Sequence, residues 1–477
     1  MSLPPLPALL DDTLRAVARR YRLPPIGAVA ERMHEANPAT ALAITIEQAR
    51  LALANGEVPG AALKHLFVES LARMVQEAIR PDAGDPAFQA MVLRHRVAHV
   101  REYASLAARA DQDRRAVLAA VNAVAHPNKQ QRIAARRLRE AMASLHAAAS
   151  ASAWADLQDA VRTLLAMPEI ANDTPDHHGL MQLLESPALE RLRRLQALTS
   201  DQLVRQYRSL WDRQGPRSGT ATATAQGVSS RQRGAAVEAL AAQALRALAQ
   251  RLNEREGSSA PYRVVTSMRV PASLPASHER AKTEWDAVLL RRAETERETA
   301  DEAGDDTPAW DVCLLVEAKA SADAATTDLP RLLRGLRLLA HAEPHVVYTF
   351  QTEQGAVRLR GAALRALPTD EADLSNRILY CSDAPAETNP RMLSAASRMQ
   401  LLSAPATLEF ASKLIDKQHA DSRELEPVWH QLIESPPWSA VLNQYRTLRQ
   451  VREFMVHADD LLAAIAEAGR RRLTYSG

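Results

Sequence analysis

Cysteine, aromatic residues and lysine are all scarce in this chain of 477 residues. The only two cysteines, Cys313 and Cys381, exclude a disulfide framework and a thiolate metal cluster, and they fit a reducing compartment. Aromatic residues make up 4% of the chain while alanine is abundant, a composition that favours closely packed helices. Nearly all basic positions hold arginine. Lys319 is therefore a candidate for a position where the chemistry requires lysine.

Long apolar runs are also missing, and the first residues do not predict a secretory leader. No stretch of about 18 consecutive apolar residues occurs, and the first residues lack the basic region and apolar core of a signal peptide. We therefore expect a cytoplasmic protein with no membrane partner. The formal net charge of +2 is too small to indicate nucleic-acid binding by itself. No glycine-rich phosphate loop is present, so the use of ATP is not indicated.

The hydrophobic pattern divides the chain into regions of different character. Apolar residues at helical spacing, separated by turn signals, predict an all-helical N-terminal domain over residues 1–213. Residues 214–230 are small, polar and glycine-rich, which is the composition of a flexible linker. An α/β domain is expected over residues 231–388 and a helical extension over residues 389–477. The fold class is therefore mostly α, with one α/β domain.

Within the predicted α/β domain, the order of elements is αβββαβ. Helices are expected where apolar residues recur every three or four positions, and strands where short apolar runs lie between turn signals. The predicted elements are a helix over 235–252, strands over 262–270, 284–290 and 311–319, a helix over 329–340 and a strand over 345–350, with a further strand over 377–382.

The apolar run from Trp310 to Ser321 ends in the residues VEAK, which place Glu317 and Lys319 two positions apart. Residues two apart on a strand point to the same face, so these opposite charges are expected together at the edge of a buried sheet. Charges in such a place are costly unless they pair or bind something. The pattern indicates a functional site. Its alternative is a surface ion pair worth about a few tenths of a kcal/mol.

Glu238 on the first helix, Asp286 on the second strand and VEAK at the end of the third resemble the PD-(D/E)xK nuclease superfamily. The resemblance covers about residues 230–350. It implies a restriction-endonuclease-like domain with a mixed sheet, and a metal-dependent nuclease that hydrolyses phosphodiester bonds of DNA. Mg²⁺ is the implied cofactor, with Mn²⁺ as a substitute. Trp285 stands where the family motif has proline, and an acidic loop over residues 292–308 lengthens the path to VEAK.

The resemblance also implies roles for particular residues. Asp286 and Glu317 would hold the metal, and Lys319 would orient the attacking water or stabilise negative charge in the transition state. Glu238 would bind the metal through water, although a plain polar position on an amphipathic helix is its alternative. Asp311 is kept as an alternate metal ligand because strand parity places it on the same side as Glu317. Such a set agrees with Mg²⁺, which takes one or two protein carboxylates and keeps several waters.

Weaker patterns lie in the N-terminal region. His95 and His99 have a spacing that can bind a metal, but without a following glutamate they are interpreted as helix-surface residues. Arg132, Arg136 and Arg139 are predicted to share one helical face that could follow a phosphate backbone, with a solvated face as the alternative. We expect the N-terminal helices to serve recognition of DNA or of a protein partner. The alternative function for the whole chain is a catalytically inactive nuclease fold that binds nucleic acid or protein.

Overall fold

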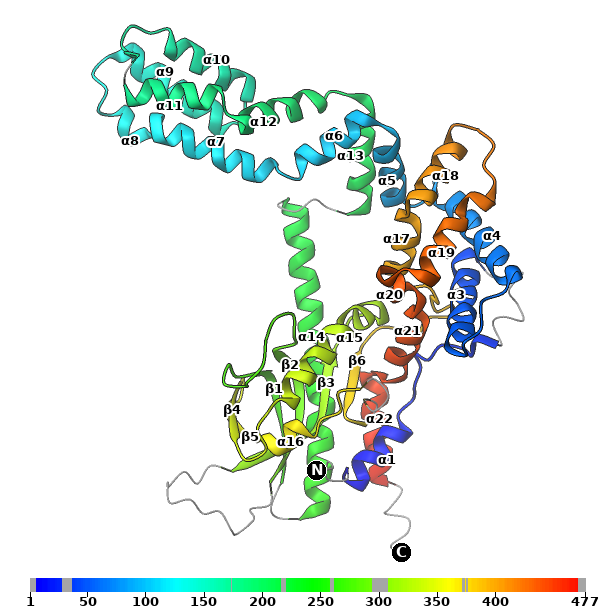
Figure 1. Ribbon diagram of the computed structural model, residues 1–477. Coiled ribbons are helices and arrows are strands. Elements are labelled where there is room, and N and C mark those ends of the chain that lie inside the picture. Colours follow the sequence, from blue (N-terminus) through cyan, green and yellow to red (C-terminus); the bar gives the residue numbers. More distant parts are fainter. Residues whose placement is uncertain are drawn as a thin grey trace, which may run out of the picture. The chain divides into compact units, whose positions relative to one another are not determined.

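The protein was analysed as a computed structural model (Figure 1). It describes residues 6–27, 37–172, 174–215, 220–257, 261–293, 308–370, 374 and 376–470. The described chain is mostly helical and holds a seven-stranded sheet with both parallel and antiparallel pairings. The prediction of a mostly α chain with an α/β domain is therefore confirmed. Over the described ranges, none of the helices combines the length and the apolar character that crossing a membrane requires.

The chain divides into two compact units, and the division differs from the predicted domains. The sheet-containing unit comprises Met1–Arg73, Ser218–Leu401 and Glu426–Gly477, and the helical unit comprises Met74–Arg217 and Leu402–Leu425. The predicted N-terminal domain of residues 1–213 is thus corrected, because its first 73 residues belong with the sheet. The predicted extension over residues 389–477 is likewise shared between the units.

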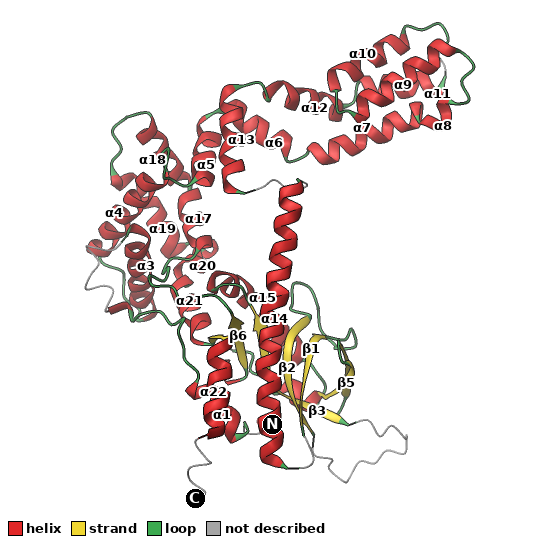
Figure 2. Cartoon of the chain, turned by 180° about the vertical axis from the view of Figure 1, so that it is seen from behind, coloured by secondary structure: helices red, strands yellow, loops and turns green. Residues whose placement is uncertain are grey.

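The long-range contacts of the first helix explain this correction. Helix α1 (Ala8–Ala16) lies beside α22 (Ala458–Arg470) in both views of the chain (Figures 1 and 2). Arg20 forms an ion pair with Asp460, close to the chain's other end. Such contacts join residues about 440 positions apart, and hydrophobic periodicity carries no information about them.

The predicted linker is helical where the structure describes its second half. Helix α14 (Ala221–Glu256) begins at Thr220, whose side chain accepts a hydrogen bond from the N–H of Ala223 at 3.1 Å. Residues 221–230, expected to be flexible, therefore form the first turns of this helix. The physical reason is that a threonine cap and the alanine-rich continuation outweigh the small cost of Gly227. Residues 216–219 of the predicted linker lie outside the described residues.

Three strands that neighbour one another in sequence form an antiparallel meander: β1 (Tyr262–Arg269), β2 (Glu284–Arg292) and β3 (Ala309–Ala318). Strand β3 is buried along nearly its whole length, which confirms the buried strand predicted from its apolar run. The predicted acidic loop between β2 and β3 lies outside the described residues over 294–307.

Beyond β3 the sheet continues in parallel. Helix α15 (Ala322–Ala340) follows β3, and β6 (Ile378–Ser382) then pairs parallel to it, with Leu315 opposite Ile378. Strand β7 (Met455–His457) pairs parallel to β6. Sequence patterning predicted β6 but missed β7, because a strand of three residues is too short to show a period.

A hairpin of β4 (Val347–Thr352) and β5 (Gly355–Arg360) changes the predicted topology. Strand β5 pairs parallel with the start of β3, and β4 pairs with β1 through Arg269 and Gln351. Strands β1 to β5 therefore close into a ring of pairings, with β6 and β7 attached to β3. The mixed sheet is as expected, but the αβββαβ core is corrected here, since β5 was not predicted and the ring depends on it.

Two helices position the polar residues described below. Helix α14 packs on β1, β2 and β3 with a face that includes Leu245 and Leu248, in one core with Trp285 (Figure 2). Helix α15 places its apolar side in the same core, and its Gly335 lies against the segment before β2. A Cβ at Gly335 would lie 2.8 Å from the Cβ of Lys282, so only glycine permits this approach.

The remaining helices fill the rest of the two units. They are α3 (Pro38–Ala54), α4 (Ala61–Ala78), α16 (Gly361–Arg365), α17 (Ala395–Ser403), α19 (Glu426–Glu434), α20 (Ser439–Leu442) and α21 (Gln444–Glu453) around the sheet-containing unit and its boundaries. Those of the helical unit are α5 (Pro86–Arg96), α6 (Ala98–Ala107), α7 (Ala110–Ala125), α8 (Pro127–Gln130), α9 (Arg136–Ser150), α10 (Trp154–Leu165), α11 (Pro175–Leu184), α12 (Pro187–Leu198), α13 (Gln202–Gln214) and α18 (Pro405–Ile415). Arg132 lies in the turn before α9, so the predicted single arginine face is not formed.

Candidate functional site

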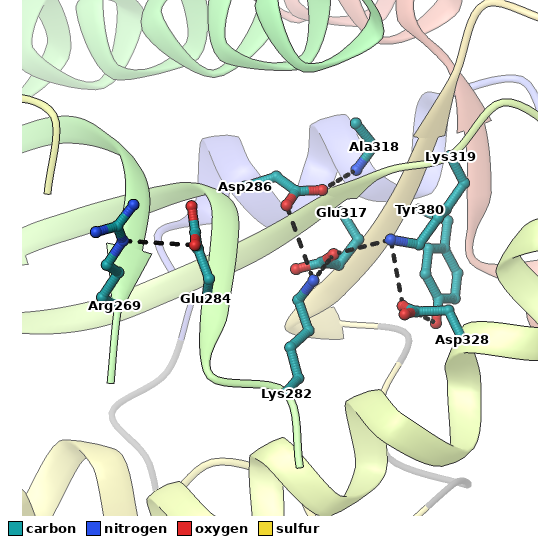
Figure 3. A network of polar contacts seen from close by, with 9 residues as sticks. All are labelled: Arg269, Lys282, Glu284, Asp286, Glu317, Ala318, Lys319, Asp328 and Tyr380. Carbon is teal, nitrogen blue, oxygen red and sulfur yellow. Dashed lines mark hydrogen bonds and ion pairs between the residues drawn. The ribbon is translucent and has the colours of Figure 1, made fainter. Parts of the chain in front are cut away.

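Two of the predicted carboxylates meet across neighbouring strands. The antiparallel register pairs Ala287 with Val316, so the next pair along β2 and β3 is Asp286 and Glu317 (Figure 3). Directly opposite residues of such a pair project from the same face of the sheet. The backbone N–H of Ala318 donates a hydrogen bond of 2.8 Å to Oδ2 of Asp286, which fixes that carboxylate at the end of β3.

The carboxylate of Glu317 is fully buried and unevenly satisfied. Its Oε2 atom forms an ion pair with Nζ of Lys282 and lies 3.3 Å from Nζ of Lys319. Its Oε1 atom is also buried and finds no hydrogen-bond partner among the described residues. A buried polar atom left unsatisfied is costly, and such exceptions in native structures call for an explanation. One oxygen of this carboxylate is therefore left without a partner among the described residues.

Lys282 is one of the residues of this cluster that the sequence did not predict. Its side chain is 5% exposed, and its Nζ lies 3.8 Å from Oδ1 of Asp286 as well as against Glu317. Figure 3 shows this ammonium rising from the segment before β2 toward both carboxylates. The scarcity of lysine singled out Lys319, and the same signal applied to Lys282 would have found it.

Lys319 is held by carboxylates on two sides. Its Nζ lies 3.3 Å from Oδ2 of Asp328 on α15, in addition to its contact with Glu317. The hydroxyl of Tyr380 on β6 donates to the same oxygen of Asp328 at 3.4 Å (Figure 3). The N–H of Lys319 donates to the carbonyl of Cys381 at 2.9 Å, so the pairing of β3 with β6 also fixes its backbone. Both Asp328 and Tyr380 lack a local sequence signal for this role.

The electrostatic environment raises the pKa values of both Glu317 and Lys319. Burial raises the pKa of Glu317 to about 8, and the nearby charge of Asp286 acts in the same direction, while Lys282 and Lys319 oppose it. Burial by itself lowers the pKa of Lys319, but the charges of Glu317 and Asp328 outweigh burial and raise it. The ammonium of Lys319 is therefore charged at neutral pH, beside a carboxyl group that resists ionisation.

Glu238 lies at the edge of this group. It is an exposed residue of α14, and burial of part of its carboxyl group together with the charge of Asp286 raises its pKa, while Lys319 lowers it. Its connection to the cluster is electrostatic. Glu238 is thus near the predicted partners, in a position from which it acts over a distance and not by direct bonding.

The structure does not bring Asp311 to the cluster. Its carboxylate is bound by the guanidinium of Arg360, with Nε donating to Oδ1 at 2.7 Å, and its register partner on β2 is Arg291. Six residues of strand separate it from Glu317, roughly 20 Å at about 3.3 Å per residue. The register also shifts between Leu289 and Leu290, so parity is not preserved along β3. Asp311 thus pairs with Arg360 at the end of β3 that lies away from Glu317.

The remaining candidates of the helical unit lie on its surface, as predicted. His95 and His99 fall on either side of the break between α5 and α6, and both side chains are more than a third exposed. Nε2 of His95 lies 3.2 Å from Glu409, and Nε2 of His99 lies 3.3 Å from Asp201. The two rings therefore have separate carboxylate partners.

The fit of a divalent cation can be judged from the donors present. No group of three or more His, Cys, Asp or Glu side chains within the described ranges is arranged to hold a metal. Two carboxylates are enough for Mg²⁺, which keeps several waters, and Asp286 with the unpartnered Oε1 of Glu317 forms such a pair. The ammonium of Lys282 already lies between these carboxylates, so a metal fits here only if Lys282 moves away.

Comparison with known proteins adds no relative to this description. No protein-family model, no curated protein and no solved structure matches the chain. Evidence for a function therefore comes from the residues of the cluster and their geometry.

Proposed function

We propose that this chain is a metal-dependent nuclease that hydrolyses phosphodiester bonds of DNA at the cluster of Asp286, Glu317 and Lys319. The observation that carries the proposal is the fully buried carboxylate of Glu317, which has an unpartnered oxygen and faces Asp286 beside two ammonium groups. Perturbed, incompletely satisfied ionisable groups concentrate at functional sites, because stability alone favours apolar replacements.

The arrangement of elements supports the same proposal. Helix α14, the meander β1–β2–β3, the crossover helix α15 and the parallel strand β6 occur in the order αβββαβ that the resemblance implies, but β6 here takes the place of the strand expected over 345–350, which is β4. In this interpretation, the hairpin of β4 and β5 is an insertion between α15 and β6. The acidic pair then lies where β2 begins and β3 ends.

Each residue of the cluster has a chemical role under this proposal. A bound Mg²⁺ or Mn²⁺ would supply Lewis acidity toward the phosphate and a lowered pKa for a coordinated water. Asp286 and Glu317 would hold the ion, and Glu238 would contribute negative charge from α14. Lys319 places its ammonium beside them and stabilises negative charge that develops on the phosphate oxygens. Asp328 is a positioning residue, because it holds the ammonium of Lys319 at 3.3 Å.

A second candidate function has its own observation. The ion pair between Lys282 and Glu317 satisfies part of the site with a cation from the chain itself. This favours a catalytically inactive nuclease fold that binds nucleic acid or a protein partner. In either case, we assign recognition of DNA or of a partner to the helical region that precedes α14.

Cleavage assays on purified protein test the proposal. Supercoiled plasmid and single-stranded DNA are incubated with Mg²⁺ or Mn²⁺ and with the variants Asp286→Asn and Lys319→Met. We expect the wild type to cleave and each variant to lose at least about a hundredfold in rate, as removal of one charged transition-state contact typically does. Glu254→Gln is the matched control, since Glu254 lies on α14 and pairs on the surface with Arg251.

Two results would contradict the proposal. Equal cleavage by the wild type and both variants would place the activity elsewhere or in a contaminant. A wild type that neither cleaves DNA nor binds Mn²⁺, but shifts DNA in a mobility assay, would instead support the inactive binding protein.

A further inference from the structure

The side chain of Lys282 bears on how the proposed site would bind a metal ion. Lys282 lies between the two carboxylates, with Nζ against Oε2 of Glu317 and 3.8 Å from Oδ1 of Asp286. We propose that Lys282 is an internal counter-cation that competes with the divalent metal ion for this position and so sets the metal concentration at which the site loads. This inference rests on the proposed function, because it concerns the same carboxylates.

The backbone of Lys282 is held in place by α15. Its N–H donates to the carbonyl of Arg331 at 3.2 Å. Gly335 packs so closely against this segment that a Cβ added to it would lie 2.9 Å from the carbonyl oxygen of Lys282. The anchor is therefore rigid while the four-carbon side chain beyond it is flexible. Such a construction lets the ammonium leave the carboxylates without unfolding the segment before β2.

The charges of the cluster give a reason for the competition. Asp286, Glu317 and Asp328 contribute three negative charges when ionised, and Lys282 and Lys319 contribute two positive ones. With Lys282 in place, part of the negative charge that would attract a divalent ion is already offset. An ammonium and a metal ion a few ångströms apart also repel each other strongly in a buried site. The metal therefore binds as Lys282 withdraws.

The counter-cation also explains how Glu317 can stay buried without a metal. An isolated buried carboxylate is costly, and a paired one much less so. Lys282 thus keeps the site folded in the metal-free state. The same contact reduces the affinity for a metal, since binding has to break it.

Calorimetric titration with MnCl₂ in the absence of DNA tests this inference. Lys282→Met removes the competing charge, and we expect it to bind Mn²⁺ at least about tenfold more tightly than the wild type. Lys282→Arg keeps the charge and is expected to bind no more tightly than the wild type. The control is Lys413→Met, because Lys413 pairs with Glu424 in the helical unit, and it should leave the affinity unchanged.

Thermal unfolding of each variant establishes that it folds, and Lys282→Gln replaces the methionine variant if that protein does not. An Mn²⁺ affinity that is unchanged or weaker after neutralisation of Lys282, in a wild type that binds Mn²⁺ and cleaves DNA, overturns the inference and leaves the proposed function intact. Absence of Mn²⁺ binding in the wild type and in the neutral variants overturns both.

Discussion

Asp113 in the helical unit and Glu317 in the sheet-containing unit are both buried carboxylates, but their surroundings satisfy them in opposite ways. Arg191 on α12 binds Asp113 on α7 through two parallel hydrogen bonds of 2.8 and 2.5 Å, one to each oxygen. These bonds with Arg191 hold the pKa of Asp113 below its usual range. Glu317 instead has two ammonium groups on one oxygen, and burial raises its pKa.

Under the proposed function, the type of cation distinguishes the structural pair at Asp113 from the proposed site at Glu317. A planar guanidinium binds both oxygens of a carboxylate at once, whereas an ammonium is a point charge that does not fix the orientation of the carboxylate. Strand β3 contains both arrangements, because Arg360 binds Asp311 as Arg191 binds Asp113. A carboxylate on a buried strand is therefore not by itself a sign of chemistry.

The largest expected effect is on DNA cleavage, which should distinguish Glu317 from Asp113. Glu317→Gln should reduce metal-dependent DNA cleavage by at least about a hundredfold, because it removes a charged ligand from the proposed centre. Asp113→Asn should change the rate per folded molecule less than about twofold. Single-turnover rates at saturating DNA measure both. Full activity of Glu317→Gln would remove the functional distinction between these residues.

A smaller effect concerns stability. Asp113→Asn should lower the free energy of unfolding of the helical unit by about 2 kcal/mol, because Arg191 loses its charged partner; the loss is below that of a fully buried pair since Arg191 is partly exposed. Native-state hydrogen exchange of α7 and α12 measures it. Glu102→Gln is the matched control, because Glu102 pairs with Arg194 in the same bidentate way on the surface. Its expected loss is below about 1 kcal/mol.

The smallest effect is a change with pH in the stability that Asp113 contributes. Its pKa is lowered in the folded state, so its contribution is complete above the unfolded-state pKa of about 3.9. It is lost as the pH falls through the lower folded-state value. The stability difference between the wild type and Asp113→Asn should therefore shrink below about pH 3.9. Acid titration of the two proteins by circular dichroism checks this, and a constant difference would contradict the assignment.

Much of the fold was predictable because it depends on local pattern. The apolar runs correctly placed β1, β2, β3, β4 and β6, and the helical periodicity placed most helices. The joining of Asp286 and Glu317 followed from the order of the strands. Strand β5 and the ring it closes were missed, since their pairings with β3 join segments about 49 residues apart. The predicted linker failed for the opposite reason, because composition concealed a strong local helix in α14.

Strand periodicity acts between near neighbours, so it was enough to predict that Glu317 and Lys319 share one strand end and that an acidic residue lies on the strand before it. That Lys282 and Asp328 complete this cluster, and that Asp311 does not, became visible only in the folded chain. These outcomes depend on the register of β2 against β3 and on the close packing of α15 at Gly335. Register and packing arise from contacts between distant segments, which no local pattern encodes.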